Sequence, residues 1–255
     1  DSQNNEPALS SLQSDFCRGP STLPIGRAES AAIQPQIPAL EKFIQMKVTE
    51  AKIAGLSVAF SYKDLQWAKG FGYANLGKKK RATEKTSYRM ASVTKTFTAV
   101  AILQLVEEGQ ISLDAEVQEY VPTFPRKEHP ITISDLLGHL SGISHYRNCD
   151  IECHIKKQKT TAQSLAIFQD WELEAPPGEK YIYTSYGYNL LGAVIENVSG
   201  LSYGTYLKRN VFEPLGMKNS HMDYERRRGS SWAKGYKKKG DALLSSEVIN
   251  ISSRF

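Results

Sequence analysis

The chain has 255 residues, of which 40% are hydrophobic and 23% are charged, and its formal net charge at pH 7 is +5. This ordinary composition excludes a wholly disordered chain, a collagen and a coiled coil. No run of residues approaches the roughly 18 apolar positions that a membrane-spanning helix needs, so no transmembrane segment is predicted.

The N-terminal stretch is rich in Ser, Pro, Gln and Asn and shows no apolar period, which predicts an extended or mobile arm over residues 1–36. Order is expected from about Pro38, where apolar residues begin to recur at the i, i+3, i+4, i+8 spacing of an amphipathic helix. These apolar residues are Leu40, Phe43, Ile44 and Val48.

A pair of strands is predicted next. Residues 56–62 alternate large and small side chains, Lys63 and Asp64 form a turn, and residues 66–74 return. Such a pattern is typical of a β-hairpin. The ordered part of the chain is therefore expected to open as one helix followed by antiparallel strands.

From Ser92 the pattern becomes helical. Residues 94–108 are apolar nearly all round, which predicts a buried central helix that ends at Gly109. Because strands come first and helices follow, the predicted fold class is α+β. The signal weakens beyond Pro214. The further helices are predicted over 132–140, 161–170, 186–198 and 202–211.

Ser92 and Lys95 form an S-x-x-K pair at the entrance of the central helix. Residues three apart share a helical face, and the first turn offers free N–H groups and the positive end of the helix dipole. Apolar surroundings favour neutral lysine, which could accept the Ser92 proton and activate its hydroxyl as a nucleophile. On this pattern alone the alternative stays open, in which Ser92 caps the helix and Lys95 extends along the surface.

Tyr183 lies just before a predicted helix, after a Pro-Pro-Gly turn at 176–178. A tyrosine acts as a base only where its phenolate is stabilised, and an ammonium such as that of Lys95 would provide this. The alternative is an ordinary aromatic core cluster.

The cysteines leave three alternatives. Cys149 and Cys153 are followed directly by His154, with His145 nearby, and Cys and His are ligands that zinc prefers. The spacing is not one of the common zinc-finger patterns, so we expect no metal and no other cofactor. A local disulfide and two unpaired thiols remain, and Cys17 is the odd cysteine.

Short basic runs are scattered along the chain and fall in turn-like stretches. A nucleic-acid-binding protein would gather such charge on one face, so we interpret the runs as solvated loops and expect no nucleic-acid partner. The runs are 78–81, 156–157, 226–228 and 237–239.

Several segments together resemble the penicillin-recognising serine hydrolases, which include class C β-lactamases, D-Ala-D-Ala carboxypeptidases and LACTB-like proteins. The resemblance runs from about Pro38 to Phe255. The segments that carry it are 71–75, 88–99 around Ser92 and Lys95, 103–109, 111–114, 131–142 with its Leu-Leu-x-His-x-Ser-Gly element, and 183–192.

The resemblance implies a β-lactamase/transpeptidase-like fold, in which an antiparallel sheet flanked by helices joins a helical lobe. The domain would cover 37–255, with its helical lobe over about 85–230. The family's closing strands, which carry its third motif, are expected beyond Phe255. A location in the periplasm or outside the cell is expected, with a signal segment removed before Asp1.

The resemblance also implies a mechanism. Ser92 would attack a carbonyl and form an acyl-enzyme, Lys95 and Tyr183 would share the proton transfers, and the N–H of Ser92 would stabilise the oxyanion. Ser185 stands where the family usually has Asn, so its contact with substrate or with Lys95 is in question. His139 is interpreted as a structural residue.

The implied substrate is a small D-Ala-type peptide, a β-lactam or an ester. An esterase or aminopeptidase of the same fold with little β-lactam turnover is one alternative. A non-catalytic binding or self-assembling scaffold is the other.

Overall fold

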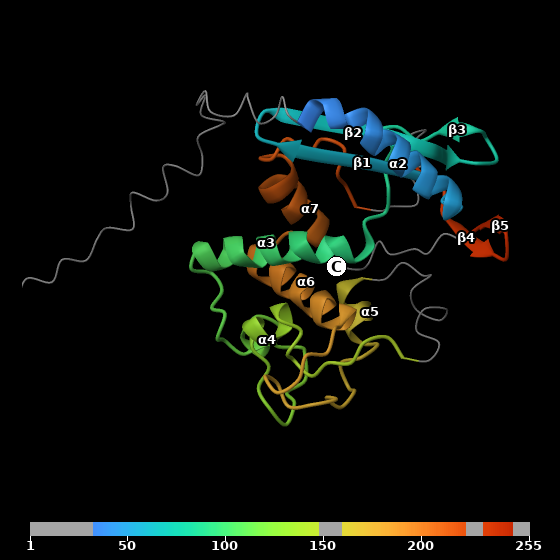
Figure 1. Ribbon diagram of the computed structural model, residues 1–255. Helices are drawn as coiled ribbons and strands as arrows, with labels where there is room; N and C mark the ends of the chain where they lie inside the picture. The colour runs from blue at the N-terminus through green and yellow to red at the C-terminus, as the bar shows by residue number, and fades with distance from the viewer. Residues whose placement is uncertain (1–32, 148–159, 223–231, 247–255) are drawn as a thin grey trace, which may run out of the picture. The chain divides into compact units, whose positions relative to one another are not determined.

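The computed structural model describes residues 33–147, 160–222 and 232–246 (Figure 1). The chain divides into two compact units, Asp1–Thr86 and Ser87–Phe255. Helices and antiparallel sheet occur together, as the α+β prediction requires. Within the described ranges, no helix is both long and apolar enough to cross a membrane.

The first unit contains a three-stranded antiparallel sheet in the order β1-β2-β3, with helix α2 against β2. The predicted hairpin is confirmed, because β1 pairs with β2 from Tyr62↔Leu65 outward across the Lys63–Asp64 turn. Of the predicted N-terminal arm, residues 1–32 lie outside the described residues, and the chain is already helical at Ile33. The elements are η3 (Gln34–Gln36), α2 (Ile37–Glu50), β1 (Gly55–Tyr62), β2 (Leu65–Asn75) and β3 (Lys80–Arg81).

The second unit is built around helix α6 (Ser185–Ser199), which contacts four other helices of the unit (Figure 1). One hydrophobic core connects them, and its largest side chains with no measurable exposure are leucines and isoleucines of α3, α4 and α6. The four helices are α3 (Thr94–Glu107), α4 (Ile133–Leu137), α5 (Thr161–Leu165) and α7 (Tyr203–Leu207).

The predicted ends of the two long helices are confirmed. Gly109 follows α3 with φ +71°, and Gly200 follows α6 with φ +68°, both in the left-handed conformation that glycine adopts at little cost. The predicted helix 202–211 is split into α7 and a π-helical turn, η7 (Lys208–Phe212). One further short turn, η5 (Val117–Glu119), lies between α3 and α4.

Helix α4 is shorter than the predicted 132–140. Thr132 and Asp135 form a capping box that fixes its start. The helix ends at Leu137, because His139 adopts a left-handed φ of +59° that an α-helix cannot continue through. The predicted helix 161–170 is likewise limited to α5, and turns follow it.

A hairpin that the sequence did not predict follows the second gap in the description. Strands β4 (Tyr236–Lys239) and β5 (Ala242–Ser245) pair around the turn that contains Gly240. The basic run 237–239, interpreted as a loop, is therefore part of an exposed strand. Lysines occupy its successive positions, so the strand lacks the alternation of apolar and polar residues that would have predicted it. The run 78–81 ends in β3, and runs 156–157 and 226–228 lie outside the described residues.

Candidate active site

Ser92 lies in a short 3-10 turn, η4 (Ala91–Val93), directly before α3. Its side chain is exposed. Ala91, the residue before it, has φ +46°, and the left-handed conformation costs a residue with a Cβ atom about 1–2 kcal/mol. Strain of this kind persists where the surrounding structure enforces it, and here it adjoins the predicted nucleophile.

Lys95 lies in the first turn of α3 and is 9% exposed. Its Nζ donates a hydrogen bond to Oγ of Ser185 over 3.0 Å. The same ammonium lies 5.0 Å from the ring centroid of Tyr183 and 5.4 Å from that of Tyr188. Lys95 has no carboxylate partner among the described residues. A buried cation is thus held by one hydroxyl and two aromatic faces.

Tyr183 contacts the ammonium of Lys95 through its ring and remains 36% exposed. Burial alone would raise the pKa of its phenol, but hydrogen bonding to Ser92 and Lys95, the charge of Lys95, and Ser185 together hold the pKa below its ordinary value. The phenolate is therefore easier to form here than in water, as a general base requires.

The N-terminus of α6 is held by side chains. Oγ1 of Thr184 accepts the N–H groups of Tyr186 and Gly187 at 3.1 and 3.2 Å, and its hydroxyl donates to the carbonyl of Ser144 over 2.8 Å. Thr184 has no exposed surface. This buried N-cap fixes the helix start and with it the position of Ser185.

Two histidines lie against the same segment. The N–H of Thr184 donates to Nδ1 of His139, and the N–H of Ser185 donates to Nδ1 of His145, each over 3.2 Å. These contacts span 45 and 40 residues of chain, so no local pattern could indicate them. Cys149 and Cys153, which follow His145 in the sequence, lie outside the described residues. Within the described ranges, no three His, Cys, Asp or Glu side chains are grouped to hold a metal ion.

The four predicted site residues lie in the second unit, and two segments far apart in the sequence supply them. The sequence left the contact between Ser185 and Lys95 in question, and the structure shows it. A serine can thus take the place of Asn as acceptor for the ammonium, although it offers only one hydroxyl hydrogen as donor. The arrangement combines an exposed serine hydroxyl, a tyrosine of lowered pKa and a buried ammonium, which suits acyl transfer.

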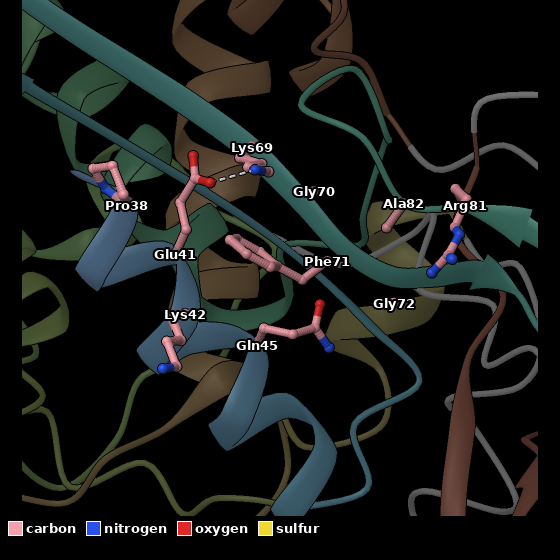
Figure 2. A pocket seen from close by; sticks show the side chains of 10 residues that line it. All are labelled: Pro38, Glu41, Lys42, Gln45, Lys69, Gly70, Phe71, Gly72, Arg81 and Ala82. Atoms are coloured by element: carbon pink, nitrogen blue, oxygen red, sulfur yellow. Dashed lines mark hydrogen bonds and ion pairs between the residues drawn. The ribbon is translucent and has the colours of Figure 1, made fainter.

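The first unit has a hollow of about 540 Å³ between α2 and β2, shown in Figure 2. Glu41 and Lys69 point toward one another across it and form an ion pair. The residues that line it include no serine, cysteine, histidine or tyrosine. The hollow therefore lacks a hydroxyl or thiol nucleophile, and the candidate active site is the cluster around Lys95.

Comparisons with known proteins identify relatives of the chain. A family model described as Beta-lactamase matches residues 40–250, which include every residue of the cluster. Protein flp of Staphylococcus aureus (strain N315) is 32% identical over 218 residues, which make up 83% of this chain and 44% of flp. The chain spans about two fifths of the length of the curated relatives it matches.

Solved structures show the same fold. An octameric penicillin-binding protein homologue from Pyrococcus abyssi matches with a TM-score of 0.72 and 35% identity, over 82% of this chain and 50% of that one. A class C beta-lactamase matches with a TM-score of 0.72 and 23% identity, over 88% of this chain and 60% of that one. At that identity the second likeness shows the fold alone.

Proposed function

The chain belongs to the beta-lactamase family of serine hydrolases, and from that premise we propose that Ser92 is the nucleophile of an acyl-enzyme mechanism. The proposed substrates are D-Ala-type peptides and β-lactams. The observation that carries the proposal is the set of contacts that Lys95 makes. Its buried ammonium donates a hydrogen bond to Ser185 and lies over the ring of Tyr183. Hydrogen bonding to Ser92 and Lys95 lowers the pKa of the Tyr183 phenol.

The proposed acylation begins with proton transfer. Tyr183, assisted by Lys95, accepts the proton of Ser92 while Oγ attacks the carbonyl carbon of the substrate. The N–H of Ser92 donates to the developing oxyanion, because N–H groups in the first turn of a helix lack carbonyl partners within it. The C–N or C–O bond then breaks, and the leaving nitrogen or oxygen takes the proton back from Tyr183.

Deacylation repeats these steps with water. Tyr183, with the ammonium of Lys95 beside it, accepts a proton from the water that attacks the acyl ester, and Ser92 leaves with that proton. Ser185 keeps the ammonium of Lys95 beside the phenol throughout. No cofactor enters either half of the reaction.

The experiment that tests the proposal is intact-mass analysis after incubation with a labelled penicillin, followed by tryptic mapping. Cleavage after Arg89 and Lys95 isolates Ser92 in a hexapeptide, Met90–Lys95. We expect one adduct, on this peptide, and its loss in Ser92→Ala. Ser61→Ala, on the exposed part of β1, is the matched control and should label normally.

The same assay separates the alternatives. No penicillin adduct, with p-nitrophenyl acetate turnover that Ser92→Ala abolishes, would favour an esterase or peptidase. The shorter Ser185 side chain favours that candidate, because it lacks the amide donor of Asn. The absence of both the adduct and ester turnover would favour a binding or self-assembling scaffold.

A further inference from the structure

The backbone between Tyr183 and Ser185 is held by two rings that the proposed mechanism does not use. The hydrogen bonds from Thr184 to His139 and from Ser185 to His145 fix two successive peptide groups, one on each side of Thr184. The orientation of these two groups determines where Tyr183 and Ser185 direct their side chains. The rings therefore act on Tyr183 and Ser185, two of the three residues that contact the ammonium.

Each of these hydrogen bonds requires a neutral imidazole. A ring nitrogen that accepts a hydrogen bond carries no proton, so the neutral rings of His139 and His145 must carry theirs on Nε2. An imidazolium has two donors and no acceptor. Protonation of either ring would therefore break its bond to the backbone.

Both rings also contact the phenol directly. The ring centroids of His139 and Tyr183 are 4.6 Å apart, and those of His145 and Tyr183 are 5.4 Å apart with the planes at 77°. His139 is 9% exposed and holds a left-handed φ of +59°. The His139 ring is therefore held by packing against its aromatic neighbours, so it can hold Tyr183 in place.

We propose that His139 and His145, as neutral rings with the proton on Nε2, are positioning residues that hold Tyr183 and Ser185 against Lys95. Their protonation releases this segment and slows the acylation of Ser92. The inference rests on the proposed function, because it gives the two rings a role in that reaction.

The surroundings of the rings keep both neutral at pH 7. Burial lowers the pKa of His139, and the positive charge of Lys95 and then His145 lower it further. Burial and then Lys95 likewise lower the pKa of His145. Within the described part of the chain, the other titratable groups that face the rings are phenols, not carboxylates. They are Tyr188 of α6 and Tyr146, Tyr181 and Tyr183 of the connecting segments.

The test compares variants that keep or remove the acceptor. In a double variant, His139→Asn with His145→Asn, each amide oxygen can accept the same N–H without titrating, and Asn tolerates the left-handed φ at position 139. His145→Phe keeps a ring but has no acceptor. We measure kcat/KM for p-nitrophenyl acetate between pH 4.5 and 8, with circular dichroism as the check on folding.

Because the pKa of each ring is lowered in the folded protein, we expect the wild-type rate to fall only at a pH well below 6.5, the ordinary pKa of histidine. The double Asn variant should lose the part of this fall that histidine protonation causes, and keep only the part that follows protonation of the Tyr183 phenolate. His145→Phe should be slower at every pH by on the order of 10- to 100-fold, because misplacement of a catalytic group by about 1 Å costs that much.

Nitrogen chemical shifts of the rings provide a second readout. The chain has five histidines, so ¹⁵N labelling of histidine gives few signals to assign. At pH 7.5 we expect Nδ1 of His139 and of His145 to be unprotonated. A proton on Nδ1 of either ring would overturn the proposal, even where His145→Phe fails to fold.

The kinetic result can overturn it as well. The proposal fails if the double Asn variant keeps the acid limb of the wild type, or if folded His145→Phe acylates at the wild-type rate. In both cases the wild type still acylates at Ser92, so the proposed function survives. A wild type that never acylates at Ser92 refutes the proposed function itself.

Discussion

Helices α2 and α6 have 14 and 15 residues, yet they bury very different shares of their surface. Helix α2 buries only Val48, whereas α6 buries every residue from 185 to 195, including the polar Ser185 and Asn189. On α2, Leu40 is 37% exposed and Phe43 53%. Apolar spacing predicted both helices, but it does not say whether an apolar face is covered.

This difference shows that the helix with more buried surface, α6, is also the one whose start positions the candidate active site. Buried polar groups are costly unless they are hydrogen-bonded, and the N-terminal end of α6 satisfies its groups with Thr184 and the two histidines. The ion pairs of α2 lie at the surface, where such pairs contribute little. Substitutions near α6 should therefore have large effects, and matched ones on α2 small effects.

The largest effect is expected on activity. Lys95→Met keeps the volume of the side chain but removes the ammonium, so turnover should fall by about 10³-fold or more. Stability should stay the same or rise, because the buried cation has no carboxylate partner in the described part of the chain and its desolvation cost disappears.

Ester turnover and urea unfolding, measured on the same sample, check this prediction. Lys42→Met, on the exposed surface of α2, is the control and should change neither quantity. Full turnover in Lys95→Met would contradict the role of the ammonium. A marked loss of stability would contradict the view that the charge serves function and not folding.

The next largest effect is on stability. Leu190 of α6 has no exposed surface, so Leu190→Ala should lower the free energy of unfolding by about 2–5 kcal/mol. Phe43→Ala on α2 removes a larger side chain but should cost within about 0.5 kcal/mol, as surface substitutions do. Equal urea midpoints for the two variants would contradict the prediction that truncation costs more on α6 than on α2.

A smaller effect is expected at the start of α6. Thr184→Val preserves shape but leaves the N–H groups of Tyr186 and Gly187 without their acceptor, at a cost of about 2 kcal/mol. Thr184→Ser retains the hydroxyl and loses one methyl group, so it should cost about half as much. If urea unfolding shows Thr184→Val to be more stable than Thr184→Ser, the hydrogen bonds of the cap contribute nothing to the free energy of unfolding.

The parts predicted from sequence are those set by local pattern. The β1–β2 hairpin follows from alternation around Lys63 and Asp64, and the long helices end at Gly109 and Gly200, as expected. Ser92 and Lys95 are three residues apart, so their placement at the start of one helix was also open to local reasoning.

What local pattern could not supply is the long-range geometry of the site. The bond between Lys95 and Ser185 joins residues 90 apart in sequence, and the two histidine contacts span 40 residues or more. Histidine on a helix-ending loop has many uses, so its acceptor role follows only from the fold. Hairpin β4–β5 was missed because lysines occupy the strand positions that usually carry apolar residues.

The last prediction contrasts how the two helices respond to acid. Hydrogen bonding to Lys69 lowers the pKa of Glu41 on α2, burial opposes this, and Trp67 adds a further hydrogen bond. A lowered carboxyl pKa contributes stability that is present above its ordinary value near 4.5 and is lost as the pH falls below it. The α2 region should therefore respond to acid only below about pH 4.5.

The α6 region should respond earlier. Because the pKa values of His139 and His145 are lowered in the folded protein, the unfolded chain binds more protons as the pH falls below about 6.5. Their contribution to stability is complete above pH 6.5 and is lost toward the folded pKa values. Urea unfolding at pH 7.5 and 5.5 should show this loss in the wild type and in Glu41→Gln, but not in the double His→Asn variant. Lys95→Met should shrink it, since the charge of Lys95 helps lower both values, and an undiminished loss in the double variant would place the acid response outside α6.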